Sequence, residues 1–273
     1  MTPNQSARQP GVDTATPLFS VVVPAYNEVA GIAVTVGRLS RYLGSTSLSW
    51  EIVVVDDGSA DATAETVEAL AAADAHVRLV RGGRHGKGAA VRRGMLEAAG
   101  TWRFMADADL SMPPEEIGRF FAALKSADSA PHVLIGSREA AGSERVGEPW
   151  RRHVVGRAFN LLVQMIVLPG IQDTQCGFKL FSAEAVTALF PRTTIDGFAF
   201  DVEVLTLARH AGYGVREVGI EWHCRPDSRV SVWRGAAAFA DILRVRWNAW
   251  SGRYRGIPAP SASGPAELER VCC

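Results

Sequence analysis

The sequence predicts an α/β fold with a mostly parallel central sheet and helices on both faces. Short runs of β-branched and aliphatic residues alternate with segments of helical periodicity along most of the chain. These runs are apolar at nearly every position, as in strands that are buried on both faces of a parallel sheet. Polar residues gather where the runs end, and such sheets bind ligands at the carboxyl ends of their strands.

The N-terminal half contains three strand–helix units. The expected strands cover 19–24, 51–56 and 77–81, and helical patterns follow at 28–43, 62–73 and 88–99. Ser59 and Asp61 precede the second helix, and we interpret them as turn and cap residues. A Gly-rich loop, GGRHGKG, separates the third strand from the third helix.

Two further strands are expected at 101–107 and 132–138, with a helix between them that starts at Pro113 and Pro114. We expect one folded domain over 18–255, ending in an amphipathic helix at about 233–252. The tails at 1–17 and 256–273 are rich in proline and small polar residues, a composition that does not bury enough apolar surface to fold.

Composition argues against several classes of protein. The 29 basic and 29 acidic residues give zero net charge, so no basic field favours nucleic acid. No window reaches about 18 consecutive apolar residues, so we expect no membrane-spanning helix. The N-terminus lacks the apolar core of a signal peptide. The four cysteines form neither a disulfide framework nor a CxxC metal pair, which favours a cytoplasmic location.

Asp107-Ala108-Asp109 is the first candidate functional motif. Carboxylates at i and i+2 of an extended chain point the same way. Divalent cations such as Mg²⁺ take oxygen ligands and often share them with substrate phosphates. We therefore expect Mg²⁺ or Mn²⁺ at Asp107 and Asp109. A turn with solvated acids is the alternative, but the second acidic strand end at Asp56 and Asp57 favours a site.

Asp57 and Lys87 extend this site. A second acid at a buried strand end is costly without a hydrogen-bond donor, and a nucleobase N–H would supply one to Asp57. Lys87 is suited to a diphosphate, although a solvated loop lysine fits the sequence equally well. The loop lacks the spacing and the Ser or Thr of a Walker A motif, and the first strand leads into PAYNE instead of GxGxxG. These departures argue against most kinases and dehydrogenases.

In order and spacing, PAYNE, VDDGSAD, GKG and DADLSMPPEE resemble the inverting glycosyltransferases of family 2, which have the GT-A fold. Segments of the C-terminal half narrow the resemblance: IGSRE, WRRHVVGRAFNLL, IQDTQCGFKLF, FAFDVEVL and DSRVSVW. From about residue 18 to 250 the chain is similar to the dolichyl-phosphate β-glucosyltransferases, and more loosely to the dolichyl-phosphate mannose synthases.

The resemblance implies a role for each site residue. The nucleotide base and ribose would lie against Pro24, Tyr26, Glu28, Val55 and Asp57. Ala106 and Ala108 would flank the diphosphate beside the metal aspartates. The donor sugar would lie at Asp173, Gln175 and Lys179, and the acceptor phosphate at Arg138 and Arg152. The catalytic set would be Asp109, Arg138, Arg152 and Asp173.

Three positions depart from the mannose synthases. His223 stands where they carry an arginine, Arg229 where they carry a lysine, and Gly156 where they often have Ser or Thr. Arg225 would face the same side as His223 if residues 215–225 form a strand, and would then replace the missing arginine. We count Arg225 and Arg229 among the substrate-binding residues.

We expect metal-dependent transfer of a hexose to a polyprenyl phosphate, with inversion. The acceptor phosphate is already anionic near neutral pH, so no strong general base is required. A metal would stabilise the departing nucleoside diphosphate, and arginines would hold the acceptor. UDP-glucose is the favoured donor. There are three alternatives. The donor could instead be GDP-mannose, the acceptor could be a soluble phosphorylated molecule, or the chain could be a non-catalytic module that anchors a membrane-protein partner.

A lipid acceptor requires contact with a bilayer. Residues 151–168 start with arginines and then become apolar, and 233–254 place Phe239, Leu243, Trp247 and Trp250 along one stripe among arginines. Cationic, Trp-bearing amphipathic helices lie in the headgroup plane. We expect a peripheral protein on the inner face of the plasma membrane. Packing of both stripes on the sheet is the alternative.

Overall fold

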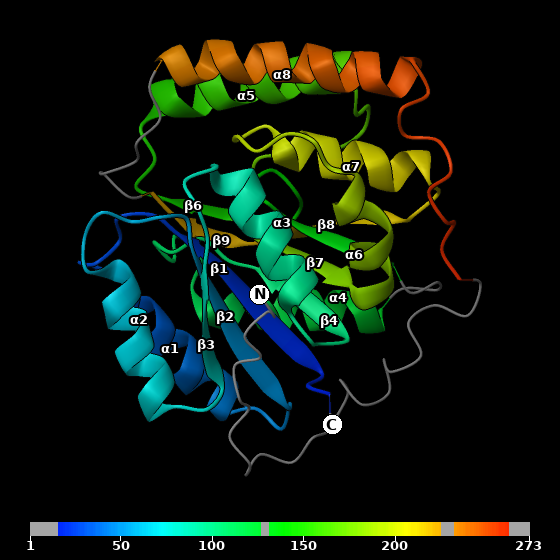
Figure 1. The fold of residues 1–273 in the computed structure, drawn as a ribbon. Helices are drawn as coiled ribbons and strands as arrows, with labels where there is room; N and C mark the ends of the chain where they lie inside the picture. Colours follow the sequence, from blue (N-terminus) through cyan, green and yellow to red (C-terminus); the bar gives the residue numbers. More distant parts are fainter. Residues whose placement is uncertain (1–15, 127–130, 225–231, 262–273) are drawn as a thin grey trace.

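The computed structural model describes residues 16–126, 131–224 and 232–261. Within them a seven-stranded sheet has the order β3-β2-β1-β4-β7-β5-β8 (Figure 1). Its strands are β1 Phe19–Ala25, β2 Trp50–Asp56, β3 Val77–Arg81, β4 Trp102–Met105, β5 Val133–Ser137, β7 Lys179–Ser182 and β8 Val215–Gly219. β7 runs antiparallel to both neighbours, and the other pairs are parallel. The predicted mostly parallel sheet is confirmed.

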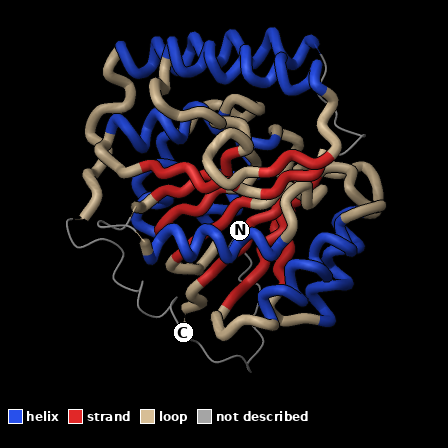
Figure 2. Tube along the Cα trace, turned by 180° about the vertical axis from the view of Figure 1, so that it is seen from behind, coloured by secondary structure: helices blue, strands red, loops and turns tan. Residues whose placement is uncertain are grey.

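Helices cover both faces of the sheet, as predicted (Figures 1 and 2). One face packs against α1 Ile32–Gly44, α2 Thr63–Ala73 and α4 Ile117–Lys125. The other face is covered by α3 Lys87–Glu97, α6 Ala183–Leu189 and α7 Phe200–His210, and α5 Trp150–Ile166 and α8 Val232–Trp250 join the same hydrophobic core from farther out. Since side chains alternate along a strand, Val21 and Val23 enter one core and Val22 enters the other. The inner strands β1, β2, β4, β5 and β7 are thereby buried on both sides, whereas the edge strands β3 and β8 are partly exposed.

Some predicted boundaries were wrong. The first helix begins at Ile32 instead of residue 28, because Gly31 N–H and Ile32 N–H both bond Glu28 O in a preceding turn. The segment after Pro113 opens with a 3-10 turn, η1 Pro114–Glu116, before α4 begins. A second 3-10 turn, η2 Phe190–Arg192, follows α6. The predicted elements exist, but local hydrogen bonds at their ends decide where regular structure begins.

The expected strand at 215–225 divides after Gly219. β8 stays in the large sheet, and β9 Glu221–His223 pairs in parallel with β6 Glu144–Val146 in a separate two-stranded sheet. Arg225 and Arg229 lie outside the described residues, and so does the prediction that Arg225 faces the same side as His223. Neither β6 nor β7 was predicted, because each is short and carries charged residues.

α5 and α8 lie side by side as an outer layer over α7 (Figure 1). Their inward faces contribute Val163, Ile242 and Val245 to the core. Tyr254, just after α8, is also buried. In the described part of the chain, every helix is too short or too polar to cross a bilayer.

Candidate active site

The loops that follow β1 and β2 are locked together at the carboxyl edge of the sheet. Asn27 N–H donates to Ser59 Oγ at 2.9 Å, and Ala60 N–H donates to Asn27 Oδ1 at 2.8 Å. Ser59 has the turn role that the sequence predicts. The cap role predicted for Asp61 is wrong, because Ala62 is the N-cap of α2 and has no side-chain cap hydrogen bond; Asp61 instead accepts Thr63 N–H at 3.0 Å in the turn before the helix. Asn27 itself adopts a φ of +53°, a conformation uncommon outside glycine. These contacts fix the positions of Tyr26 and Glu28 at the edge.

Asp57 finds its donors within the chain, which corrects the expectation that it needs a nucleobase. Its buried carboxylate accepts His85 N–H at 3.0 Å and Gly86 N–H at 2.8 Å. Sequence reasoning missed these donors because they come from a loop 28 positions away that folds back over β2. In the same loop the Arg84 guanidinium lies 5.3 Å from the centre of the Tyr26 ring. Asp57 therefore holds the Gly-rich loop over the ends of β1 and β2.

The two candidate metal aspartates lie in a turn, not on extended chain as expected. β4 ends at Met105, and Leu110 N–H bonds Asp107 O at 3.2 Å to close the turn. Ala106 and Ala108 are buried beneath it. Asp109 is exposed and accepts Ser111 N–H at 3.0 Å. The turn therefore presents the two carboxylates at the sheet edge.

Lys87 contacts this turn directly. Its Nζ lies 2.6 Å from Asp107 Oδ1, with 22% of the lysine and 28% of the aspartate side chain exposed. Burial lowers the pKa of Lys87, but attraction from Asp107, Asp201 and Asp109 outweighs burial and leaves it raised. Since both turn aspartates act on one ammonium group, the structure brings the GKG and DAD motifs into a single cluster.

Gly177 brings the DTQCGFKLF segment against the same cluster. A Cβ atom at this position would stand 1.8 Å from Asp107 Oδ2. Any side chain there would displace the carboxylate, so only glycine permits this close approach. The sequence offered one signal for it, a glycine inside the most specific motif of the C-terminal half.

Arg138 and Asp173 form a bidentate pair at the end of β5. Arg138 Nε lies 2.7 Å from Asp173 Oδ2, and Arg138 Nη2 lies 2.9 Å from Oδ1. The guanidinium also lies 5.3 Å from the centre of the Trp222 ring. Burial raises the pKa of the Asp173 carboxyl, but the Arg138 charge and hydrogen bonds outweigh it and hold that pKa at about 2. Both side chains are therefore charged, and Arg138 is held in one orientation.

Three expected site residues have no exposed surface in the structure: Val55, Asp173 and Lys179. Val55 packs in the hydrophobic core. Lys179 Nζ lies 2.5 Å from Asp201 Oδ1 and also donates to Cys176 O. These residues are buried next to the site and do not line it. A sequence motif does not show whether its residues are buried or exposed.

Gln175 and the remaining candidates are placed differently. Gln175 is half-buried, and its buried Nε2 finds no hydrogen-bond partner in the described part of the chain. Pro24 and Glu28 are also half-buried. Arg152 belongs to the first turn of α5, where the structure describes the backbone but not this side chain. Among these candidates, Gln175 therefore has a buried donor that is unsatisfied within the described residues.

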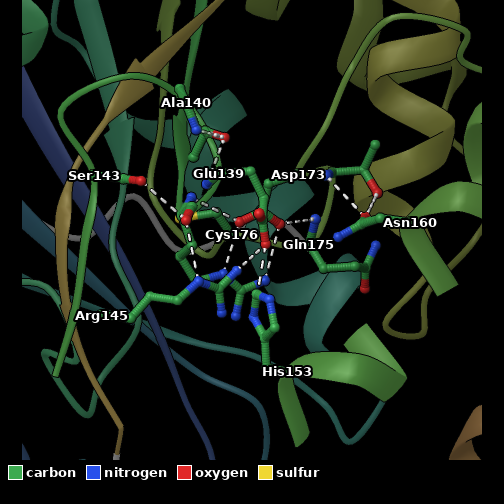
Figure 3. Close-up of polar contacts among 12 residues, drawn as sticks. Glu139, Ala140, Ser143, Arg145, His153, Asn160, Asp173, Gln175 and Cys176 are labelled. Atoms are coloured by element: carbon green, nitrogen blue, oxygen red, sulfur yellow. Dashed lines mark hydrogen bonds and ion pairs between the residues drawn. The ribbon is translucent and has the colours of Figure 1, made fainter. Parts of the chain in front are cut away.

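A charged cluster missed by sequence reasoning joins α5 to the loop after β5 (Figure 3). Arg145 pairs with both Glu139 and Glu148. His153 Nδ1 lies 3.4 Å from Glu148 Oε2, and Arg157 Nη1 lies 3.4 Å from Glu139 Oε2. These contacts fix the start of α5 beside Arg138.

Asn160 links α5 to the segment that touches the aspartate turn. Its Oδ1 accepts Thr174 Oγ1–H at 3.1 Å and Thr174 N–H at 3.3 Å. Asp173 precedes Thr174, and Gly177 follows three residues later. Residues 173–177 therefore contact Arg138, α5 and Asp107 within one short stretch of chain.

Cys176 lies in this stretch but is not a nucleophile. Burial raises the pKa of its thiol to about 12. Its side chain would also meet any Cβ placed at Gly136, at 2.9 Å. The residue packs between β5 and the segment 173–177, and the thiol stays protonated near neutral pH.

The described residues contain no group of three or more His, Cys, Asp and Glu side chains placed to hold a metal. Asp107 and Asp109 are two acidic ligands beside a cationic lysine. An ion bound there would take its remaining ligands from water and from a substrate, as Mg²⁺ commonly does. The arrangement fits a cation that is held together with a phosphorylated substrate.

Known proteins are similar to this chain over most of its length. A 34% identical dolichyl-phosphate beta-glucosyltransferase from Trichomonas vaginalis matches over 233 residues, 82% of this chain and 69% of the relative. The human dolichyl-phosphate beta-glucosyltransferase is 30% identical over 256 residues, 89% of this chain and 79% of its own. Both matches extend over most of the described fold.

Solved structures share the fold at lower identity. Glucosyl-3-phosphoglycerate synthase from Mycobacterium tuberculosis, in complex with UDP, superposes with a TM-score of 0.62 at 20% identity, over 94% of this chain and 88% of that one. Mannosyl-3-phosphoglycerate synthase from Rubrobacter xylanophilus gives 0.63 at 18%, over 90% and 78%. These likenesses confirm the predicted GT-A fold. The model of glycosyl transferase family 2 matches residues 20–190, so the chain belongs to that family and is a glycosyltransferase.

Proposed function

We propose that this glycosyltransferase moves glucose from UDP-glucose to a polyprenyl or dolichyl phosphate and forms a β-linked lipid-phosphate sugar. The relatives named above support the donor sugar and the class of acceptor. One structural observation carries the proposal. Residues 173–177 contact Asp107 through Gly177 and Arg138 through Asp173. The acidic turn at Asp107 and the oriented guanidinium of Arg138 therefore both lie next to residues 173–177.

The donor would bind at the edge formed by β1, β2 and β4. Tyr26, Glu28, Pro24 and Asp57 would lie along the nucleotide, and Lys87 along the diphosphate. Asp107 and Asp109 would hold Mg²⁺ or Mn²⁺, which supplies positive charge to stabilise the departing diphosphate. A crystallised neighbour of the same fold, glucosyl-3-phosphoglycerate synthase, was solved with Mn²⁺ and UDP-glucose.

Arg138 would position the acceptor. Asp173 occupies Nε and Nη2, which leaves Nη1 to donate to an acceptor phosphate. A phosphate monoester is already anionic at neutral pH and needs orientation more than deprotonation. Arg152 in α5, and Arg225 and Arg229 beyond the described residues, would add positive charge. Gln175 Nε2 would donate to the donor sugar.

The outer layer of α5 and α8 would lie on the membrane that contains the acceptor. α5 exposes Trp150, Val154, Val155, Leu161 and Met165, and α8 exposes Phe239, Leu243, Trp247 and Trp250. Exposed apolar groups in this density mark an interaction surface. We place the protein on the inner face of the plasma membrane, peripherally bound.

A donor–acceptor matrix tests the proposal. Radiolabelled UDP-glucose, UDP-GlcNAc and GDP-mannose are each offered decaprenyl or undecaprenyl phosphate with Mg²⁺ or Mn²⁺, and label in the organic phase is counted. We expect label from UDP-glucose alone. Label only from GDP-mannose would replace glucose by mannose, and no lipid-linked label from any donor would contradict the acceptor.

Asp109→Asn provides the matched variant for this assay. Asp109 is exposed and makes one hydrogen bond to Ser111 N–H, so the variant should fold with normal stability. We expect its turnover to fall by about a thousandfold, because removal of a group that stabilises developing charge costs that order of magnitude. Near-normal turnover with saturating metal would contradict the metal assignment.

A further inference from the structure

Lys87 is fixed beside Asp107 by the backbone on which it stands. It is the first residue of α3 and follows Gly86, which adopts a φ of +114°. Cβ atoms added at Gly86 and Gly88 would stand 2.6 Å from Asp196 O and Ile195 O, respectively. The start of α3 is thereby pressed against residues 195–196, and Lys87 Nζ reaches Asp107 Oδ1 at 2.6 Å.

A second carboxylate attracts Lys87 from the interior. Asp201, in the first turn of α7, is buried, and its charge acts on Lys87 as well as on Lys179. Lys179 Nζ lies 2.5 Å from Asp201 Oδ1 and has no exposed surface. Lys87 is therefore paired with the partly exposed Asp107 and is also attracted by the charge of the buried Asp201, which is itself paired with Lys179.

The contact with Asp107 conflicts with cation binding. A carboxylate oxygen 2.6 Å from an ammonium group has little free capacity for a divalent ion, and two positive charges at that distance repel each other. A donor diphosphate would relieve the conflict, because its oxygens attract Lys87 away from the aspartate.

We infer that Lys87 is an exchangeable counter-ion, which neutralises Asp107 in the free protein and releases it when a divalent cation and the donor diphosphate bind together. This inference rests on the proposed metal site at Asp107 and Asp109. It makes Lys87 a positioning residue that couples the two ligands: the cation alone binds weakly, and the diphosphate strengthens its binding by occupying Lys87.

Direct binding of Mn²⁺ tests the inference without turnover. Free Mn²⁺ is measured by electron paramagnetic resonance for the full-length wild type and for Lys87→Met, with and without UDP. Without UDP, we expect Lys87→Met to bind Mn²⁺ about fivefold more tightly, the size of effect that a partly exposed ion pair gives. With UDP, we expect this gain to disappear or reverse, because the variant lacks the ammonium group that contacts the diphosphate.

Two further variants isolate the cause. Arg93→Met removes the same charge from the same helix, but Arg93 pairs with Glu97 on the surface, so its Mn²⁺ affinity should equal that of the wild type. Lys87→Arg keeps the positive charge and should keep the weak binding. Equal or weaker Mn²⁺ binding by Lys87→Met without UDP would overturn the inference.

Failure of the proposed metal site would give a different result from failure of the counter-ion role of Lys87. If wild-type Mn²⁺ binding in the presence of UDP is unchanged by Asp109→Asn, the metal site itself is wrong. If Asp109→Asn abolishes that binding while Lys87→Met matches the wild type in both conditions, only the counter-ion role is wrong. A thermal melt of each variant confirms that the binding data come from folded protein.

Discussion

At the scale of single residues, the pairing of Arg138 with Asp173 shows how a fully buried charge orients a partly exposed one. Breaking such a pair leaves an unpartnered charge inside the protein, at a cost of about 3–5 kcal/mol. Asp173 also accepts Arg138 N–H at 3.0 Å. Its role is to fix both the backbone and the side chain of Arg138, which explains why an aspartate in a family motif has no exposed surface.

This pair makes stability depend on pH in acid. The folded-state pKa of Asp173 is about 2, below its ordinary 3.8. Its contribution to folding, on the order of 2 kcal/mol, is therefore fully present above pH 3.8 and is lost as pH falls through about 2. We expect Asp173→Asn to be less stable than the wild type at pH 6 and to lose less stability between pH 4 and 2. Urea unfolding at several pH values measures both, and parallel curves would contradict the assignment.

Gly177 and Gly88 are both too crowded for a side chain, but we expect substitution of the first to impair activity and of the second to impair stability. A Cβ at Gly177 meets the Asp107 carboxylate, a side-chain end that is able to move, whereas a Cβ at Gly88 meets Ile195 O at 2.6 Å and the Phe200 Cβ at 2.7 Å. We expect Gly177→Ala to melt within about 2 °C of the wild type yet lose most Mn²⁺-dependent turnover. We expect Gly88→Ala to lose about 1–3 kcal/mol of stability through overpacking. Calorimetry with the transfer assay distinguishes them, and the reverse pattern would contradict this view.

At the scale of elements, α7 joins the site to the C-terminal segment. Its fully buried Glu203 accepts Thr194 N–H at 2.7 Å, Ile195 N–H at 2.8 Å and Tyr254 O–H at 2.9 Å. Residues 195–196 in turn contact Gly86 and Gly88 at the start of α3. The short motif FDVE thus supplies Asp201 to the charge cluster near Lys87 and Glu203 to the loop that supports it.

Glu203→Gln tests this anchoring role. The amide would turn an N–H₂ group toward donors that need an acceptor, and an unsatisfied buried group costs about 1–3 kcal/mol. We expect a loss of stability in that range by urea unfolding. Glu97→Gln, on the exposed face of α3, is the control and should change stability by less than about 0.5 kcal/mol. Equal stability of both variants would show that Glu203 is not an anchor.

The elements that were predicted from the sequence are those whose hydrophobic pattern lies within one continuous segment. β1 and β2 contain continuous apolar runs, and β3 is a short run of Val and Leu interrupted by Arg78; the ends of all three lie within about a residue of the predicted ones. β7 was missed because it has four residues and includes Lys179, whose burial depends on Asp201, 22 positions later. The division between β8 and β9 follows from pairing with β6, a partner far away in sequence.

At the scale of the whole molecule, the exposed apolar side chains of α5 and α8 allow the proposed membrane binding to be tested. Trp247 and Trp250 are 62% and 71% exposed. We expect the protein to float with anionic vesicles at low salt and the double variant Trp247→Ala/Trp250→Ala to remain in solution, since amphipathic binding depends on buried aromatic area. Val34→Ala, an exposed apolar change on α1, is the control and should float normally. No flotation of the wild type would argue against a lipid acceptor.

The candidate site was predictable where parallel strands bring their ends together. The polar ends of β1, β2 and β4 had to share an edge, and they do. The partners of the individual side chains were not predictable, because Asp57 with Gly86, Lys87 with Asp107, and Arg138 with Asp173 each join segments that meet only in the folded chain. The family motifs identified these residues but did not show which of them are buried.

The antiparallel strand β7 has a consequence for synthesis of the protein. The first four strands to emerge from a ribosome already make the contiguous block β3-β2-β1-β4 by residue 105. β5 emerges next but neighbours only β7 and β8, so this wholly buried strand has no place to dock until residue 182 has been translated. The growing chain therefore carries an unpaired apolar strand from residue 137 until residue 182 has been added, an interval in which we expect a nascent chain to depend most on chaperones.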